Sequence, residues 1–203
     1  MKAVLMSVQP KWCELIASGK KTVEVRKTKP KLETPFKCYI YCTSSNIHEC
    51  LIQNESGVKL IYACNYKTAI PFGGQIANGK IIGEFICDKM VWVLAHPNVF
   101  AGHPLFYSQA IKDACLTQDE VEKYSGGKDV YGWHITDLVI YDKPKELSEF
   151  KRPCDGNCQE CNHALWQTYT FISESKIVGC TQKVTAPQSW CYVEELEKGG
   201  AEQ

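Results

Sequence analysis

The sequence has no excess of either charge and no long hydrophobic run. Its 203 residues include 23 lysines and arginines and 23 aspartates and glutamates, so the formal net charge at pH 7 is zero. A chain without net charge has no global field that would draw it to nucleic acid or to an anionic membrane. No apolar stretch reaches the roughly 20 residues that a membrane-spanning helix needs. Any contact with a polyanion must therefore come from a local patch, and no membrane partner is expected.

The N-terminus also lacks the features of a secretory signal. Pro10 and Lys11 interrupt the first apolar run before a hydrophobic core and a cleavage site could form. We therefore expect a cytoplasmic protein, in which cysteines are thiols or metal ligands rather than a disulfide framework. We interpret the scattered cysteines of the first 115 residues as mostly buried small hydrophobes, namely Cys13, Cys38, Cys42, Cys50, Cys64, Cys87 and Cys115.

What the chain does have, near its start, is a compact strand, helix and strand pattern. Five apolar residues predict a short buried strand, namely Ala3, Val4, Leu5, Met6 and Val8. Pro10 suits the first turn of a helix, where its missing N–H would be unpaired anyway, and Gly19 suits the end, where the backbone turns left-handed. The alternation in residues 22–26 predicts a second strand.

That second strand carries the main candidate binding residues. The alternation turns Val23 and Val25 toward the core and places Glu24 and Arg26 on the opposite face, about 7 Å apart along the chain. We expect Arg26 to form an ion pair, and the Glu24 carboxylate can accept a hydrogen bond from the exocyclic amine of cytosine.

A local basic patch surrounds the same strand. At its entrance, Lys21 can hold a phosphate as a cation, or act as a base if it is desolvated. Residues 27–31 are explained equally well as the solvated edge of a sheet. The cations of the patch are Lys20, Lys21, Arg26, Lys27, Lys29 and Lys31.

Two aromatic positions have open interpretations. Trp12 fits the apolar stripe of the helix, and the alternative is that its ring lines a cleft and stacks a base. Trp133 alternates with His134, so one of the two must face inward. His134 is then either a hydrogen-bonded core residue or, with a carboxylate nearby, a general base.

Gly19, Lys21, Glu24 and Arg26 form the pattern Gly-x-Lys-x-x-Glu-x-Arg, and residues 131–138 read YGWHITDL. Together these segments resemble the ASCH domain, a branch of the PUA-like superfamily. The resemblance implies an α+β fold over residues 1–149, with a small β-barrel and flanking helices, and a cleft that binds RNA or a modified nucleoside. The implied nucleic-acid-binding residues are Trp12, Lys20, Lys21, Glu24, Arg26 and His134.

A hydrolase is the alternative function. Some relatives resemble amidohydrolases that remove the acetyl group from acetylated cytidine with a lysine, a threonine and a glutamate, and others resemble ribonucleases. Lys21 matches the lysine, but Glu24 stands where the threonine would be. An enzyme would use Lys21 and Glu24 as catalytic residues, with the third partner open among Asp113, Glu120 and Glu122.

The remaining pattern predicts further strands and two more helices. Aromatic and β-branched residues recur between glycine, asparagine and proline breaks, as in the strands of a barrel. Thr117 and Glu120 have the spacing of a capping box at the start of a helix. The expected strands are residues 36–43, 59–64, 80–93 and 131–141, and the expected helices are residues 108–115 and 117–124.

Residues 150–195 form a short cysteine-rich extension, followed by a disordered tail at 196–203. Few aliphatic side chains are present there, so a structural zinc ion would replace the missing core. The expected ligands are Cys154, Cys158, Cys161 and Cys180, with His163 or Cys191 as substitutes for the fourth. Free or paired thiols and a redox role are the alternatives. We expect Trp190 to anchor an extended segment against the barrel, and the extension is also a possible docking site for a protein partner.

Overall fold

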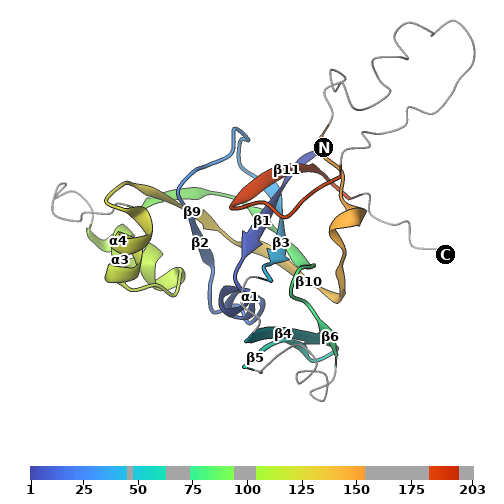
Figure 1. The fold of residues 1–203 in the computed structure, drawn as a ribbon. Helices are drawn as coiled ribbons and strands as arrows, with labels where there is room; N and C mark the ends of the chain where they lie inside the picture. Colours follow the sequence, from blue (N-terminus) through green and yellow to red (C-terminus); the bar gives the residue numbers. More distant parts are fainter. Residues whose placement is uncertain (45–47, 63–73, 94–103, 154–182, 197–203) are drawn as a thin grey trace, which may run out of the picture.

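The computed structural model describes residues 1–44, 48–62, 74–93, 104–153 and 183–196 (Figure 1). The fold of these residues is mostly β with few helices. Its largest unit is a five-stranded sheet in the order β10-β7-β3-β1-β11, in which β1 and β3 are parallel and the other neighbours are antiparallel. The strands are β1 (Lys2–Val8), β3 (Phe36–Cys42), β7 (Ile81–Cys87), β10 (Thr136–Lys145) and β11 (Trp190–Glu194).

A second sheet brings together the two segments that carry the sequence resemblance. Its order is β2-β9-β8, with β2 (Val23–Arg26), β9 (Val130–His134) and β8 (Met90–Val93). In the antiparallel β2 and β9 pair, Glu24 lies opposite Trp133 and Arg26 lies opposite Tyr131. Residues opposite one another share a face of the sheet. The Gly-x-Lys-x-x-Glu-x-Arg strand and the predicted closing strand are thus direct neighbours.

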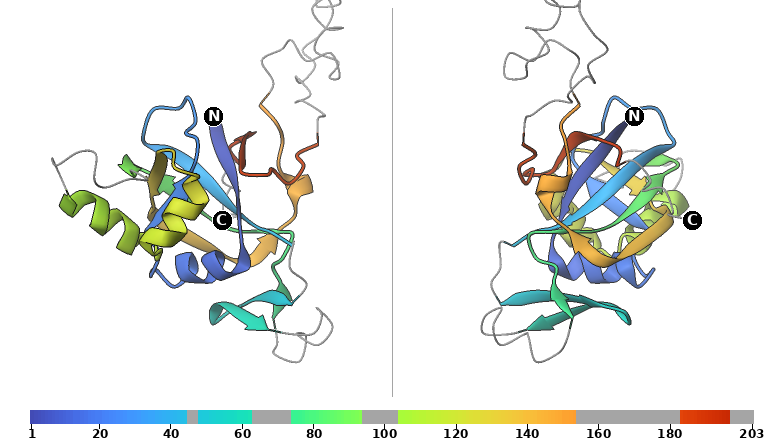
Figure 2. Two further views of the ribbon diagram at one scale, coloured as in Figure 1. Left: turned by 60° about the vertical axis from the view of Figure 1, so that its left-hand side comes forward. Right: turned by 90° about the vertical axis from the view of Figure 1, so that its right-hand side faces the viewer.

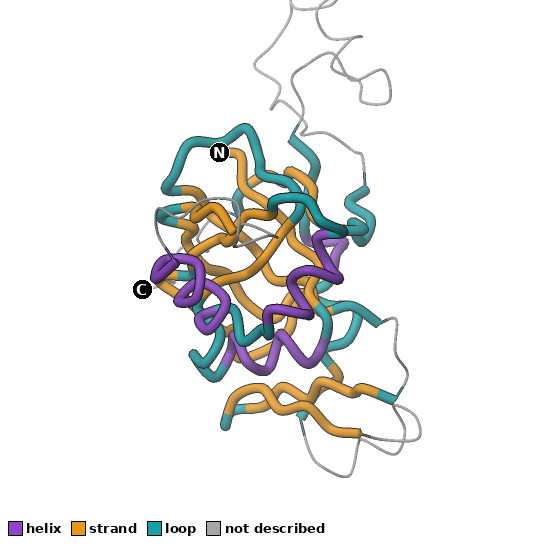
Figure 3. Tube along the Cα trace, turned by 90° about the vertical axis from the view of Figure 1, so that its left-hand side faces the viewer, coloured by secondary structure: helices purple, strands orange, loops and turns teal. Residues whose placement is uncertain are grey.

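A third, smaller sheet lies beside α1 (Pro10–Ala17), set apart from the other strands (Figures 2 and 3). Its order is β5-β4-β6, and the Leu60 amide of this sheet donates to the Glu14 carboxylate of the helix at 2.9 Å. The sequence pattern did not predict its middle strand. The strands are β4 (Glu49–Asn54), β5 (Gly57–Tyr62) and β6 (Gln75–Ile76).

The expected barrel is not closed within the part of the chain that the structure describes. The segment predicted as one strand at 80–93 is broken at Asp88 and Lys89, so β7 joins the first sheet and β8 joins the second. Its partner segment is broken in the same way at Ile135, between β9 and β10, and Asp137 takes a left-handed φ of 47°. Both segments pass from one sheet to the other at neighbouring points. The described strands therefore form two sheets instead of one closed barrel.

Helices α1 and α4 (Gln118–Ser125) begin and end where the sequence indicates, whereas the helix expected at 108–115 begins and ends earlier, at Pro104 and Asp113. Pro10 occupies the first turn of α1, and Gly19 follows its end with φ +72°. The predicted capping box of Thr117 and Glu120 starts α4, and Gly126 ends it in the left-handed conformation. The remaining helices are α3 (Pro104–Asp113) and the short 3-10 helix η3 (Leu147–Glu149).

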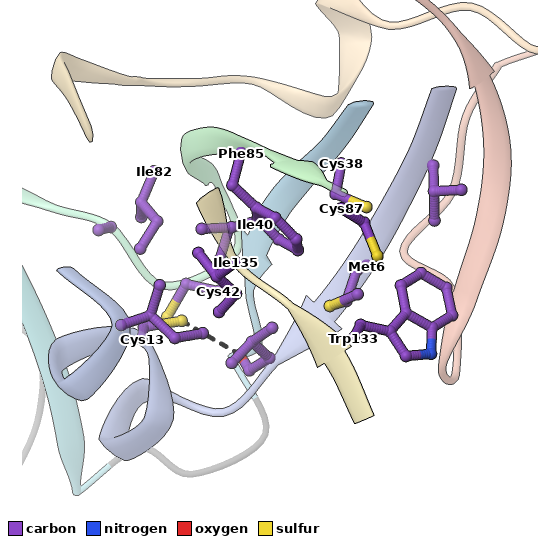
Figure 4. Packing of buried hydrophobic residues seen from close by; sticks show 14 of the residues in the cluster. Met6, Cys13, Cys38, Ile40, Cys42, Ile82, Phe85, Cys87, Trp133 and Ile135 are labelled. Atoms are coloured by element: carbon purple, nitrogen blue, oxygen red, sulfur yellow. Dashed lines mark hydrogen bonds between the residues drawn. The ribbon is translucent and has the colours of Figure 1, made fainter. Parts of the chain in front are cut away.

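The core lies between the two larger sheets and α1, and cysteines contribute to it (Figure 4). Cys13, Cys38, Cys42 and Cys87 are packed among Met6, Ile40, Ile82, Phe85, Trp133 and Ile135. Burial raises the pKa of the Cys13 thiol well above its ordinary value, with the neighbouring Cys42 adding to the effect. Cys50 is also buried, whereas Cys115 is partly exposed and Cys64 lies outside the described residues. The interpretation of the described cysteines as mostly buried small hydrophobes is confirmed.

Candidate functional site

A cleft of about 1020 Å³ opens where the end of β1, α1, β2, α4 and the segment 187–189 meet. The alternation predicted for β2 is what builds one wall. Val23 and Val25 pack in a cluster with Ala110 and Val121 from α3 and α4. The side chain of Glu24 lies in the cleft wall, together with those of the cations before and after it.

Lys21 lies in this wall and is almost fully buried, with 2% of its surface exposed. Its Nζ donates to the carbonyl oxygen of Ala114 at 2.7 Å and lies 3.3 Å from Oε2 of Glu24. The same Nζ is 5.0 Å from the centre of the Trp12 ring, a cation–π distance. Lys21 therefore donates a hydrogen bond to the backbone of Ala114, and the carboxylate of Glu24 is the charged group with which it pairs.

Arg26 forms the expected ion pair and two further bonds. Its Nη2 lies 2.9 Å from Oε1 of Glu24 and donates to the Ser7 carbonyl at 2.5 Å, while Nη1 donates to the Ser189 carbonyl at 3.4 Å. Its Nε, also buried, has no hydrogen-bond partner among the described residues. Glu24 thus forms an ion pair with a different cation on each oxygen, and the buried trio of Lys21, Glu24 and Arg26 carries one more positive than negative charge.

Trp12 both packs in the core and lines the cleft, and the stacking of a base on its ring stays a prediction. Its ring packs against the main core cluster and also lines the cleft. It lies between two lysines, with Nζ of Lys11 at 4.3 Å and Nζ of Lys21 at 5.0 Å from the ring centre. Lys20, in contrast, is exposed at the strand entrance and is not part of the cleft lining.

His134 lies away from the cleft. It is opposite Val23 in the register of β2 and β9, and it therefore shares the helix-packed face rather than the face of Glu24. Trp133 is the residue of this pair that faces the core. A carboxylate is present beside the imidazole, since Nδ1 of His134 and Oδ1 of Asp88 are 2.6 Å apart. Burial alone would raise the pKa of Asp88, but the hydrogen bond to His134, the charge of His134, a backbone hydrogen bond and the charge of Lys89 together lower it.

Of the three acids considered as a further catalytic partner, only Glu120 lines the cleft. Its carboxylate is engaged in the capping box, where it accepts from the Thr117 amide at 2.8 Å and faces the Thr117 hydroxyl at 3.1 Å. This backbone hydrogen bond lowers the pKa of Glu120, and the charges of Lys11 and Lys21 act in the same direction. Asp113 and Glu122 instead accept from glutamines of their own helices, at 2.7 Å each. An ionised Glu120 engaged in this cap is poorly suited to act as an acid.

Several cleft residues were not predicted. Thr43, from the loop after β3, lines the cleft, and its hydroxyl has no hydrogen-bond partner among the residues described. Lys123 and Tyr124 reach the cleft from α4. No local sequence pattern marks these residues as part of a cleft, because the segments that bring them together lie far apart in the sequence. The capping box of α4 was the available signal for that helix, but it does not show which face of the helix meets β2.

The segment 187–189 closes the cleft from the C-terminal side. The Ser7 hydroxyl donates to the Pro187 carbonyl at 2.5 Å, and the Ser7 amide donates to the Ser189 carbonyl at 2.9 Å. The expected anchor is confirmed. The Trp190 ring lies 6.0 Å from that of Trp133, and β11 extends the first sheet beside β1.

The predicted zinc ligands Cys154, Cys158, Cys161 and Cys180, and the substitute His163, lie outside the described residues, as do residues 197–203 of the predicted tail. Cys191, the other substitute, is half-buried on β11, and burial raises the pKa of its thiol. Within the described ranges, no three His, Cys, Asp or Glu side chains are grouped to hold a metal ion. The zinc site stays a prediction. The described helices include none that is long and apolar enough to cross a membrane.

The described residues form a mostly-β fold in which helices flank a charged cleft. Residues 6–84 match the family model of the ASCH domain. The chain therefore carries an ASCH domain, and the resemblance seen in the sequence is confirmed.

The chain is also similar to solved structures. A tyrosine-to-phenylalanine mutant of ZmASCH from Zymomonas mobilis aligns with a TM-score of 0.52 at 15% identity, over 96% of this chain and 92% of that chain. ASCH from Zymomonas mobilis aligns with a TM-score of 0.45 at 16% identity, over 95% of this chain and 88% of that chain. At such identities the likeness to the first structure concerns the fold alone. The search of curated proteins found no match.

Proposed function

We propose that this ASCH domain binds RNA or a modified nucleoside in the cleft walled by Lys21, Glu24 and Arg26. The observation that carries the proposal is the buried network of these residues, in which two cations flank a single carboxylate at 3.3 and 2.9 Å. The cleft lining as a whole has three cations, Lys21, Arg26 and Lys123, against the two carboxylates of Glu24 and Glu120. Its excess of one positive charge attracts an anion such as a phosphate, and the low dielectric of the cleft wall strengthens that attraction. ASCH domains are linked to RNA binding or RNA hydrolysis, which agrees with this ligand class.

The dimensions and the other walls support a nucleotide-sized ligand. The cleft volume of about 1020 Å³ is at the upper end of the usual range for small-molecule pockets. Trp12 and Tyr124 present rings in its walls, and aromatic rings stack nucleic-acid bases without regard to sequence. Lys123 adds a cation on the exposed surface of α4, at a position suited to a phosphate. Glu24 chiefly holds the two cations in place, since each of its oxygens is already paired with one of them.

The test is equilibrium binding of a fluorescent single-stranded RNA, followed by anisotropy at several salt concentrations. Lys123→Glu reverses a cleft charge at an exposed position, and Lys112→Glu makes the same change on α3 outside the cleft. Lys21→Met removes the buried charge while keeping a long side chain. We expect Lys123→Glu and Lys21→Met to weaken binding about tenfold or more, and to lower the salt slope by about one unit per lost phosphate contact.

The control variant Lys112→Glu should bind as the wild type does. Equal losses in Lys112→Glu and Lys123→Glu would mean that the RNA responds to overall charge and not to the cleft. Thermal unfolding of each variant separates a loss of binding from a loss of fold.

A hydrolase is the second candidate, and one observation favours it. The Thr43 hydroxyl, which has no hydrogen-bond partner within the described part of the chain, lines the same cleft as Lys21 and Glu24. In this arrangement Lys21, a fixed donor, would stabilise negative charge developing on a substrate oxygen. Incubation with RNA and with acetylated cytidine, followed by chromatography of the products, tests this function. Turnover that is lost in both Lys21→Met and Thr43→Val would establish an enzyme, and binding without any product would leave the binding function alone.

A further inference from the structure

A second hollow, of about 500 Å³, lies beyond the end of β2. Its walls come from the segment after β2, through Lys29 and Thr34, and from the second sheet, through β8 and Tyr131 of β9. Trp92 of β8 is 64% exposed beside it. Its exposed indole ring is available to stack a nucleic-acid base, as aromatic rings do in single-strand recognition.

The hollow is connected to the cleft by one row of side chains across the second sheet. Arg26 lies opposite Tyr131, and Tyr131 lies opposite Trp92. Because opposite residues share a face, this row runs from the wall of the cleft to the wall of the second hollow. The distance across each pair of neighbouring strands is about 5 Å.

Lysines lie over the aromatic rings of both hollows. Nζ of Lys27 is 5.1 Å from the ring centre of Tyr124, in the cleft, and Nζ of Lys29 is 5.5 Å from that of Tyr131, in the second hollow. The two lysines are two positions apart, so their Cα atoms are separated by at most about 7 Å. Each hollow therefore has a lysine over one of its aromatic rings, although the chain as a whole has no net charge.

We propose that the ligand is single-stranded RNA, and that it extends from the cleft past Lys27 and Lys29 to a second base-binding site on Trp92 and Tyr131. This inference rests on the proposed function and assigns its substrate class. A single strand offers phosphates to the lysines and unstacked bases to the rings in alternation. An RNA duplex keeps its base faces stacked inside the helix, and a free nucleoside is too short to reach the second hollow.

The test compares an RNA single strand of about eight nucleotides, a length within the range that one small domain contacts, with a mononucleotide as competitor. Trp92→Ala should weaken binding of the longer strand about tenfold, which is typical of one lost stacked base, and should leave the mononucleotide unaffected. Trp92→Phe keeps an aromatic ring and should retain most of the binding. Tyr62→Ala, at a 74% exposed aromatic residue on β5, is the matched control and should bind normally.

Each result decides one of the two proposals. If the longer strand binds no better than the mononucleotide, or Trp92→Ala binds it like the wild type, the extended site is overturned and the cleft remains. The extended site is also overturned if an RNA duplex of equal length binds as tightly as the single strand. If neither the mononucleotide nor the longer strand binds the wild type, the proposed function itself fails.

Discussion

Arg26 and Ser189 are joined by a hydrogen bond of 3.4 Å from Nη1 to the carbonyl oxygen, across 163 positions of sequence. The same guanidinium donates to the Ser7 carbonyl and pairs with Glu24. One buried side chain thus connects the end of β1, the motif strand β2 and the segment that closes the cleft on its C-terminal side.

Arg26→Lys should loosen that segment. A lysine has a single nitrogen in place of the planar fork, and it cannot bond to Ser7, Glu24 and Ser189 at once. We expect a loss of about 2 kcal/mol in the free energy of unfolding. The Ser7 amide, which donates to Ser189, should exchange its hydrogen faster, and this is measurable by hydrogen exchange with mass spectrometry. Arg152→Lys, at an exposed position, is the control, and equal exchange in both variants would contradict the role of Arg26.

Glu24→Gln should destabilise the fold more than an ordinary surface change. It leaves the charges of Lys21 and Arg26 buried without their common partner, and breaking a buried pair in this way costs about 3 kcal/mol or more. The double variant Lys21→Met with Glu24→Gln removes one cation as well, so its loss should be smaller than the sum of the two single losses. Chemical denaturation of all four proteins gives the coupling. Strict additivity would mean that Lys21 and Glu24 do not interact.

The elements that the sequence predicted well are those that depend on neighbouring residues. Pro10 and Gly19 bound α1, Thr117 and Glu120 cap α4, and the alternation of Val23 and Glu24 separates the packed face of β2 from the cleft face. Each of these signals involves residues that are close together in the sequence, so it depends little on the rest of the fold.

The features that were missed depend on distant pairing. An apolar run such as residues 80–93 indicates strands but not the sheet that each half joins, which is decided by hydrogen bonds to β3 and β9. Thr43 reaches the cleft because β3 lies beside β1, and the segment 187–189 does so through Ser7. His134 was expected at the ligand, but the register of β2 and β9 places it on the other face. A one-residue shift of register would reverse that result, and local sequence does not specify it.

The zinc prediction for Cys154, Cys158, Cys161 and Cys180 has a direct test. Purified protein should contain about one zinc ion per chain by elemental analysis, and this content should fall in Cys158→Ser, because structural sites use four ligands. Cys50→Ser is the control, since Cys50 is buried in the third sheet and no metal is expected there. Metal content near zero in the wild type, purified without chelator, would favour the free-thiol alternative.

The lowered pKa of the Glu84 carboxyl group makes the stability of the fold depend on pH. Its carboxylate accepts from the Tyr141 hydroxyl at 2.7 Å and pairs with Nζ of Lys37 at 2.9 Å. Burial alone would raise the pKa of Glu84, but the hydrogen bonds from Tyr141 and Lys37 outweigh it and lower the pKa below its ordinary value of 4.5. The unfolded state then binds the proton more readily. The stabilisation is therefore complete above the unfolded pKa and is lost as the pH falls through the folded one.

Glu84→Gln should accordingly lower the free energy of unfolding at pH 7 by about 1 kcal/mol, allowing for the partial exposure of the pair. The difference from the wild type should shrink below about pH 4, where the wild-type carboxylate also becomes neutral. Glu33→Gln, at an exposed position, should show no such dependence. Denaturation curves between acid and neutral pH measure both variants. If the difference in the free energy of unfolding between Glu84→Gln and the wild type stays constant down to acid pH, the loss comes from the packing of the side chain and not from its charge.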